Sequence, residues 1–190
     1  MLLSIDTTAG TSTAVFDGKQ LLSSVVFEDP FGHAENIGKA ITEALAQAGL
    51  TALDISRVLV GRGPASYTGL RVGIAAAKTL ATSLDVPLHG VMVLDALAHE
   101  TRGEVLVTTD AKRRELFAAT YSEGKRLSGP MLLSPAELSR FEGLEHVQGA
   151  SDAAKNGSFA LATELDLSDS SAIYLRSPDV TPSKGKRVSG

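Results

Sequence analysis

A repeated order of predicted strands and helices constrains the fold of this chain more than any other feature. Residues 2–7, 11–16 and 21–27 have the apolar runs and period-two alternation of three strands, and Asp17-Gly18 is typical of a tight turn between the last two. The pattern then predicts a helix at 33–48, a strand at 57–61, a helix at 66–84, a strand at 88–93 and a short helix at 94–100.

The second half repeats this order in shortened form. Strands are predicted at 105–109, 115–121 and 126–133, followed by helices at 135–140 and 152–165. The first strand of each half runs into an aspartate, Asp6 or Asp110. Two copies of a βββαβα unit, the second one trimmed, predict a two-lobed α/β protein that arose by internal duplication. We expect the lobes at 1–101 and 102–176, followed by a loose tail at 177–190 that is rich in Ser, Pro, Gly and Lys.

Composition excludes several classes of protein. The chain has 190 residues and no cysteine, so it has neither disulfides nor a cysteine-based zinc site. Its net charge of -4 argues against strong independent binding of nucleic acid. No apolar stretch approaches the roughly 20 residues that span a membrane, and the start lacks a basic leader. We therefore expect a cytoplasmic protein with no membrane contact.

The first candidate site is the turn after the first strand. Asp6 ends the strand, and Thr7 and Thr8 follow it. Backbone N–H groups and hydroxyls in such a turn can hold phosphate oxygens, and the acid can orient water or Mg²⁺. A polar hairpin turn, in which Asp6 satisfies local donors, explains the same residues.

The second candidate site is the glycine-rich loop between the strand at 57–61 and the next helix. Gly61 and Gly63 would let the backbone approach a ligand, and Ser66 lies where the helix begins, an end that favours anions. The loop lacks the lysine of a phosphate-binding Walker loop, and Ser66 replaces the third glycine of a dinucleotide fingerprint. A capped helix start is the alternative.

The third candidate site is Asp110, which three basic residues follow within DAKRRELFAATY. That arrangement suits an anion, although a hairpin turn with solvated charges explains it equally well. The four histidines have no i, i+4 spacing on a helix, so no metal site is expected. No serine nucleophile motif is present either.

These stretches and their spacing resemble the TsaB family, also called YeaZ, within the actin-like (ribonuclease H-like) ATPase fold. The resemblance rests on SIDTT at residues 4–8, GRGPASYTGLRVG at 61–73, DAKRRELF at 110–117 and YLRSPD at 174–179. It covers about residues 2–180 of the chain.

The resemblance implies a non-catalytic subunit. Proteins of this family pair with TsaD, a catalytic relative of the same fold, and work with the ATPase TsaE. TsaD transfers the threonylcarbamoyl group to the adenosine beside the anticodon of tRNA. TsaD-like proteins carry a His-x-x-x-His metal motif on the first helix, where this chain has His33 and Ile37. We therefore expect no metal, no cofactor except possible ATP or ADP at the junction with TsaD, and contact with tRNA only through the complex.

The resemblance also implies a docking face on the helices at 33–48 and 66–84. That face would bind TsaD, or close a homodimer when the chain is alone. Its expected residues are His33, Ile37, Ile41, Tyr67, Val72 and Ala76. Ordinary packing between lobes or against the sheet would also explain the small residues of the second helix.

Three other functions compete with this interpretation. A small-molecule kinase or ATPase of the same fold would hydrolyse ATP through Asp6. A peptidase would need a metal pair or an activated nucleophile, and neither is visible in the sequence. A dinucleotide-binding oxidoreductase, suggested by Gly61 and Gly63, would need an acid such as Asp95 to hold a ribose.

Overall fold

Five strands form the first sheet, namely β1 (Leu2–Asp6), β2 (Thr11–Asp17), β3 (Gln20–Phe27), β4 (Arg57–Gly61) and β5 (Leu88–Val91). The computed structural model describes residues 1–29 and 31–176. The strand order is β3-β2-β1-β4-β5, with β1 antiparallel to β2 and parallel to β4. The carboxyl ends of β1 and β4 therefore meet at one edge, which places Asp6 beside Gly61.

Four strands form the second sheet, namely β6 (Glu104–Asp110), β7 (Leu116–Ser122), β8 (Lys125–Leu133) and β9 (Glu145–Gln148). Their order, β8-β7-β6-β9, repeats that of β3-β2-β1-β4, and β6 is again antiparallel to one neighbour and parallel to the other. This repetition confirms the predicted duplicated α/β fold with a trimmed second half.

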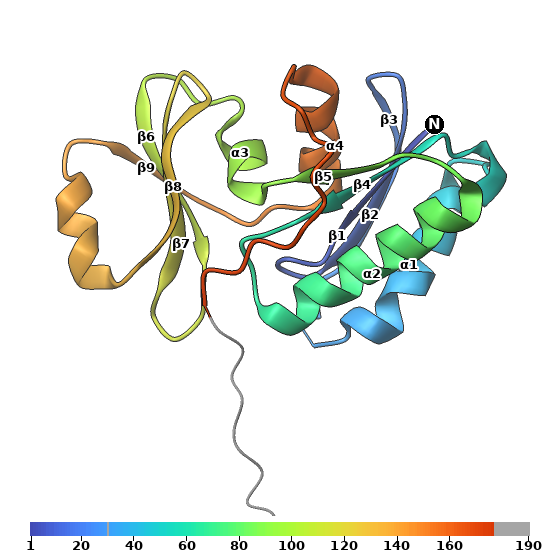
Figure 1. The fold of residues 1–190 in the computed structure, drawn as a ribbon, viewed down its shortest axis with the longest axis horizontal. Helices are drawn as coiled ribbons and strands as arrows, with labels where there is room; N and C mark the ends of the chain where they lie inside the picture. Colours follow the sequence, from blue (N-terminus) through green and yellow to red (C-terminus); the bar gives the residue numbers. More distant parts are fainter. Residues whose placement is uncertain (30, 177–190) are drawn as a thin grey trace, which may run out of the picture.

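The helices and sheets alternate in layers, as Figure 1 shows. The helices are α1 (His33–Gln47), α2 (Tyr67–Leu84), α3 (Val93–Ala98) and α4 (Ala153–Ala162), with short 3-10 turns η1 (Ala52–Asp54) and η2 (Pro135–Phe141). α1 and α2 cover the outer face of the first sheet, α3 and α4 lie between the two sheets, and η2 covers the outer face of the second.

The outer core of the first lobe follows the apolar stripes that the sequence predicts. Ala40, Ala44 and Leu45 of α1 are buried against β2 and β3, and Ile37 and Ile41 are partly buried beside them. Burying one such large aliphatic side chain contributes roughly 1.5–3 kcal/mol before entropy is counted. These stripes therefore fix which side of α1 faces the sheet.

α4 comes from the second half of the sequence but packs on the first sheet. Its Ala153 and Phe159 join Leu2, Phe16 and Leu59 in one buried cluster. The last helix of the described residues thus covers the inner face of the sheet with which the chain begins. A boundary between lobes at residues 101 and 102 remains a prediction, and the tail at 177–190 lies outside the described residues.

Two sets of polar contacts hold the lobes together. Tyr121 of β7 donates a 2.9 Å hydrogen bond to Asp95 of α3, and Arg126 Nε lies 3.2 Å from the same carboxylate oxygen. The chain after α4 also contacts both lobes, since Ile173 N–H donates to the carbonyl of Arg62 at 2.8 Å and Arg176 Nη1 donates to the carbonyl of Ala111 at 3.1 Å. Because Asp95 is engaged with the second lobe, the dinucleotide-binding interpretation loses the acid that it requires.

The predicted elements of the second half differ from the structure in three places. The helix predicted at 135–140 is the 3-10 segment η2, and the helix predicted at 152–165 ends at Ala162. β9 was not predicted, because its sequence EHVQ is short and polar. Within residues 1–29 and 31–176, none of the helices combines the length and apolarity needed to cross a membrane.

Candidate functional site

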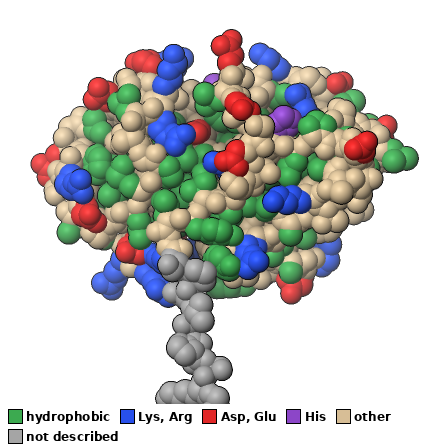
Figure 2. Space-filling view, viewed as in Figure 1, with side chains coloured by type: hydrophobic (Ala, Val, Ile, Leu, Met, Phe, Trp, Pro, Cys, Tyr) green, Lys and Arg blue, Asp and Glu red, His purple; other side chains and the backbone are tan. Residues whose placement is uncertain are grey.

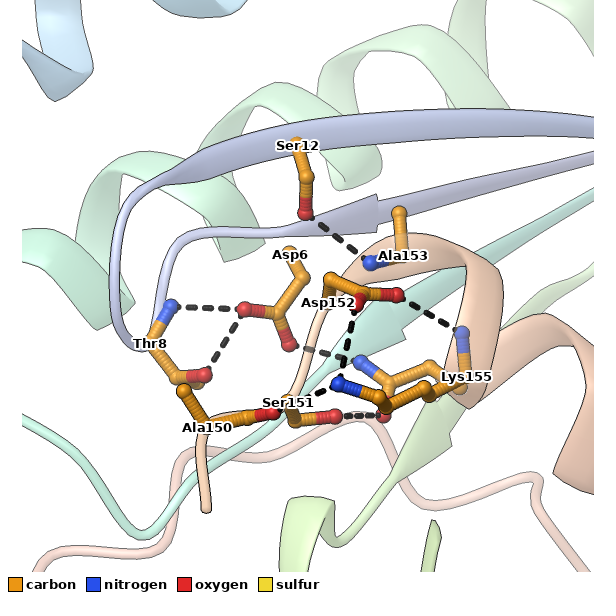
Figure 3. Close-up of polar contacts among 9 residues, drawn as sticks. Asp6, Thr8, Ser12, Ala150, Ser151, Asp152, Ala153 and Lys155 are labelled. Carbon is orange, nitrogen blue, oxygen red and sulfur yellow. Dashed lines mark hydrogen bonds and ion pairs between the residues drawn. The ribbon is translucent and has the colours of Figure 1, made fainter. Parts of the chain in front are cut away.

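Asp6 ends the central strand β1, and protein donors occupy both of its carboxylate oxygens. Its Oδ1 accepts the backbone N–H of Thr8 at 2.8 Å and the Thr8 hydroxyl at 2.7 Å (Figure 3). Its Oδ2 accepts the side-chain amide of Asn156 at 2.6 Å. The Asp6 residue is 1% exposed. A carboxylate in this setting has no open face for a water molecule or a metal ion.

The first turn of α4 places Asn156 on Asp6. Asn156 is fully buried, and its Oδ1 accepts the hydroxyl of Ser151 at 2.8 Å. The N–H of Ala153 donates to the Ser12 hydroxyl at 2.9 Å, and the Asp152 side chain caps the helix by accepting the N–H of Lys155 at 2.8 Å (Figure 3). Two hydrogen bonds, from Asn156 to Asp6 and from Ala153 to Ser12, therefore connect α4 to β1 and β2 beside its apolar packing.

The electrostatics of Asp6 reflect this enclosure. Burial raises the pKa of the Asp6 carboxyl above its ordinary value, while the hydrogen bonds from Thr8 and Asn156 lower it. The nearby Asp152 carboxylate adds to the increase. A buried acid with its oxygens already bonded is suited to holding the two halves of the chain together.

Gly61 and Gly63 serve the packing of the fold. A Cβ on Gly61 would overlap Oδ2 of Asp6, so only glycine lets β4 lie this close to the acid. Gly63 has a φ of 97°, which favours glycine, and its carbonyl accepts the N–H of Val93 at 3.0 Å. Thr7 is also buried, and its hydroxyl donates to the carbonyl of Gly69 at 2.8 Å.

A cavity of about 640 Å³ lies between the lobes, where β1 and β6 end. We call it the interlobe cavity. Its lining includes Thr8, Ser66 and Asp110 from the three predicted stretches, together with Phe31, His33 and Lys112. The structure thus brings three of the seven predicted nucleotide-site residues to one cavity. The other four, Asp6, Thr7, Gly61 and Gly63, are buried and do not line it.

Asp110 repeats the geometry of Asp6 in the second sheet, but at the surface. Its Oδ1 accepts the N–H of Lys112 at 2.7 Å, and its Oδ2 lies 2.8 Å from Lys112 Nζ. The side-chain contact with Lys112 lowers the pKa of the Asp110 carboxyl. The acid of the second half is therefore charged and already paired.

The residues of the predicted docking face differ in how accessible they are. Ile37, Ile41, Val72 and Ala76 are half-buried on α1 and α2, the two helices that form the outer layer of the first lobe. Tyr67 is also half-buried, between the Tyr174 ring and the Arg71 guanidinium. His33 is 6% exposed, and its Nδ1 lies 3.0 Å from the Thr11 hydroxyl, so its side chain belongs to the interior.

Across the described parts of the chain, no three His, Asp or Glu side chains are grouped closely enough to bind a metal ion. Ile37, four residues after His33, packs against the core.

Asn156 is the functional residue that the sequence analysis missed. The signal that could have found it is its place on the buried side of α4, where it lies among Ala153, Gly157 and Phe159. A polar amide in such a stripe needs a buried partner. The identity of that partner, 150 positions away in the sequence, depends on the fold.

The sequence matches proteins of tRNA modification. Residues 31–175 match the family model described as TsaD: tRNA N6-adenosine threonylcarbamoyltransferase. An uncharacterized protein of Mycobacterium tuberculosis is 35% identical over 199 residues, which cover 95% of this chain and 94% of the relative. An uncharacterized protein of Mycobacterium leprae is 36% identical, and the chain spans 56% of its length. The tRNA threonylcarbamoyladenosine biosynthesis protein TsaB of Bacillus subtilis is 36% identical over 92 residues, which cover 47% of this chain and 40% of that protein.

Two solved structures from Pseudomonas aeruginosa share the fold. One is YeaZ and the other is an uncharacterized protein with similarity to peptidase YeaZ, with TM-scores of 0.73 and 0.76. Each is 22% identical to this chain, and each match covers 92% of this chain and 99% of the other. The two-lobed architecture predicted from the sequence is therefore confirmed.

Proposed function

The chain belongs to the TsaB (YeaZ) family, and on that premise we propose that it serves the formation of threonylcarbamoyladenosine in tRNA as a non-catalytic subunit that binds and supports TsaD. The single observation that carries the non-catalytic part is the closure of Asp6. Thr8 and Asn156 occupy both oxygens of the acid that an active relative would use to orient water or Mg²⁺.

The same closure argues against the kinase or ATPase alternative. A metal ion could reach Asp6 only if Asn156 left it, and Asn156 is held by Ser151 and by the packing of α4. The second acid, Asp110, is paired with Lys112. A nucleotide polyphosphate would therefore lack a charged metal partner at either strand end. Thr8, Ser66 and Asp110 remain proposed ligand contacts, since all three line the interlobe cavity.

The outer layer of the first lobe is the proposed docking face for TsaD. α1 and α2 lie side by side there (Figure 1) and leave the half-buried side chains of Ile37, Ile41, Val72 and Ala76 near the surface. Helix pairs can pack closely where such small and aliphatic residues meet. The same face would close a homodimer of the isolated chain, and TsaE would join through the complex with TsaD.

The experiment that tests this function is a reconstitution. The purified chain, TsaD and TsaE are incubated with threonylcarbamoyl-adenylate and unmodified tRNA, and each protein is left out in turn. We expect modification to need TsaD and to fall when this chain is omitted. Modification of tRNA by this chain without TsaD, or ATP hydrolysis by this chain that disappears in Asp6→Ala, would contradict the proposal.

A further inference from the structure

The turn between β6 and β7 presents three consecutive cations. Lys112, Arg113 and Arg114 are exposed, and all three have positive φ angles of 62°, 55° and 63°. Side chains other than glycine rarely adopt this backbone conformation. The N–H of Lys112 bonded to Asp110 and the N–H of Glu115 bonded to the Lys112 carbonyl at 3.0 Å hold the turn in it. The backbone conformation of the turn is therefore defined at all three basic residues.

One of these cations, Lys112, lies at the interlobe cavity, where it is paired with Asp110. Lys112 lines the cavity directly, and Arg113 and Arg114 follow it in the turn. Lys and Arg side chains gather at the lower left edge of the molecule in Figure 2, where Figure 1 places this turn. Although the whole chain carries a net charge of -4, residues 110–115 carry three cations against the two acids Asp110 and Glu115, so this turn is locally positive. A local positive rim favours an anionic ligand.

The start of α2 faces the same cavity without a side-chain cap. Ser66 is the N-cap residue and lines the cavity, but its hydroxyl makes no capping hydrogen bond. The first N–H groups of this 18-residue helix are therefore not satisfied by that side chain. Such a helix start binds phosphate oxygens, because the N–H groups and the helix dipole act together.

An exposed aromatic ring completes the lining. Phe31 is 91% exposed and lies at the cavity, with His33 two residues later. A phenylalanine left in water beside a cationic rim is typical of surfaces on which unpaired nucleotide bases stack. The cavity volume of about 640 Å³ is within the range of sites for small organic groups.

We propose that the interlobe cavity binds an unpaired stretch of RNA. A phosphate of the strand lies at the start of α2 near Ser66, the turn at 112–114 follows the backbone, and a base stacks on Phe31. Unpaired RNA fits better than a metal-bound polyphosphate, because Asp6 and Asp110 are both paired within the chain. The inference rests on the proposed function, which supplies tRNA as the RNA in question.

The proposal is tested by fluorescence anisotropy of a labelled RNA hairpin with an unpaired loop, titrated with the full chain at about 50 mM salt, where phosphate contacts are strong. The same RNA paired throughout as a duplex is the comparison. We expect measurable binding of the hairpin and weaker binding of the duplex, with an affinity that falls as salt rises.

Three variants separate binding from folding. Ser66→Asp places an anion at the helix start, where it caps α2 but repels phosphate, so affinity should fall about 10-fold while Tm is kept or raised. Arg114→Gly relieves the left-handed backbone and should reduce the salt slope by about 0.7. Phe31→Ala should weaken hairpin binding about 10-fold. The charge control is Lys19→Glu, at an exposed turn between β2 and β3, which should bind RNA as the wild type does.

Several outcomes would overturn the proposal. They are equal affinity for hairpin and duplex, unchanged RNA affinity in all three folded variants, and absence of RNA binding by the wild type. A fourth is competition by ATP: ATP displaces the hairpin from the wild type, and the three variants that lose RNA affinity also lose ATP affinity. Capture of TsaD by each variant is measured in parallel. If wild-type chain fails to capture TsaD, the proposed function fails while the RNA measurement still stands, so the two failures are distinguishable.

Discussion

Asn156 of α4 donates a 2.6 Å hydrogen bond to Asp6 of β1, which joins residues 150 positions apart at the centre of the first lobe. Both residues are buried. The bond fills the coordination space of the one acid that ends the central strand. It also ties α4, from the second half of the sequence, to the sheet built by the first half.

The first prediction concerns the stability contributed by this bond. Asn156→Ala removes a donor and leaves a buried carboxylate oxygen without a partner, which should lower the free energy of unfolding by about 1–3 kcal/mol. Urea denaturation measures it. The control is Asn36→Ala on α1, where no side-chain hydrogen bond is made within the described residues and the change should stay within about 0.5 kcal/mol. Equal small effects in both variants would mean that the amide does not hold Asp6.

The second prediction concerns pH. The pKa of Asp6 is higher in the folded chain than in the unfolded one, so the folded chain binds the extra proton between the two values. The contribution of this carboxyl to stability is therefore fully present below the unfolded pKa, near 4, and is lost as pH rises through the folded pKa. In Asp6→Asn that titration is absent. The free energy of unfolding of the wild type minus that of Asp6→Asn should decrease as pH rises from about 4. A difference that stays constant or increases would contradict the assignment.

How much of this arrangement the sequence could predict depends on whether its cause is local. The apolar spacing of Ile37, Ile41 and Leu45 predicts α1 because one helix face alone determines it. The acids at 6 and 110 were found because each follows an apolar strand, and the duplicated order then predicted two sheets. These inferences needed only neighbouring residues.

Features that depend on distant contacts were missed. β9 has only Val147 as an aliphatic residue, and it is a strand because its backbone pairs in parallel with β6. Asn156 was overlooked because its partner comes from the opposite end of the chain. The seven predicted nucleotide-site residues looked equivalent in the sequence, yet only Thr8, Ser66 and Asp110 reach the interlobe cavity. Burial separates them from the other four, and burial is set by packing between elements.

The third prediction concerns the contact between lobes. Tyr121→Phe removes the hydroxyl that donates to the buried carboxylate of Asp95, which should cost about 1.5–3 kcal/mol because the acceptor is charged. Thermal and urea denaturation check it. Tyr174→Phe is the matched control, since that side chain is 42% exposed and its hydroxyl makes no hydrogen bond within the described residues. A loss of stability no larger than that of the control would show that Arg126 alone satisfies Asp95.

The fourth prediction concerns docking on TsaD. Ala76→Glu inserts a charge on the outer layer formed by α1 and α2, and the desolvation of that charge at an interface should weaken TsaD binding at least about 10-fold. Calorimetry or a pull-down with purified TsaD measures it. Gln20→Glu adds the same charge at the exposed first residue of β3 and should leave the affinity unchanged. If both variants are folded and bind TsaD equally well, the docking face lies elsewhere.

The most direct test of the central claim compares tRNA modification by TsaD with wild-type chain and with Asp6→Asn, each at a concentration where the complex with TsaD has formed. If the chain acts by docking, Asp6→Asn supports the same rate as the wild type, and neither form modifies tRNA without TsaD. A complex that forms normally with Asp6→Asn but loses turnover would show that Asp6 takes part in the reaction and would contradict the account.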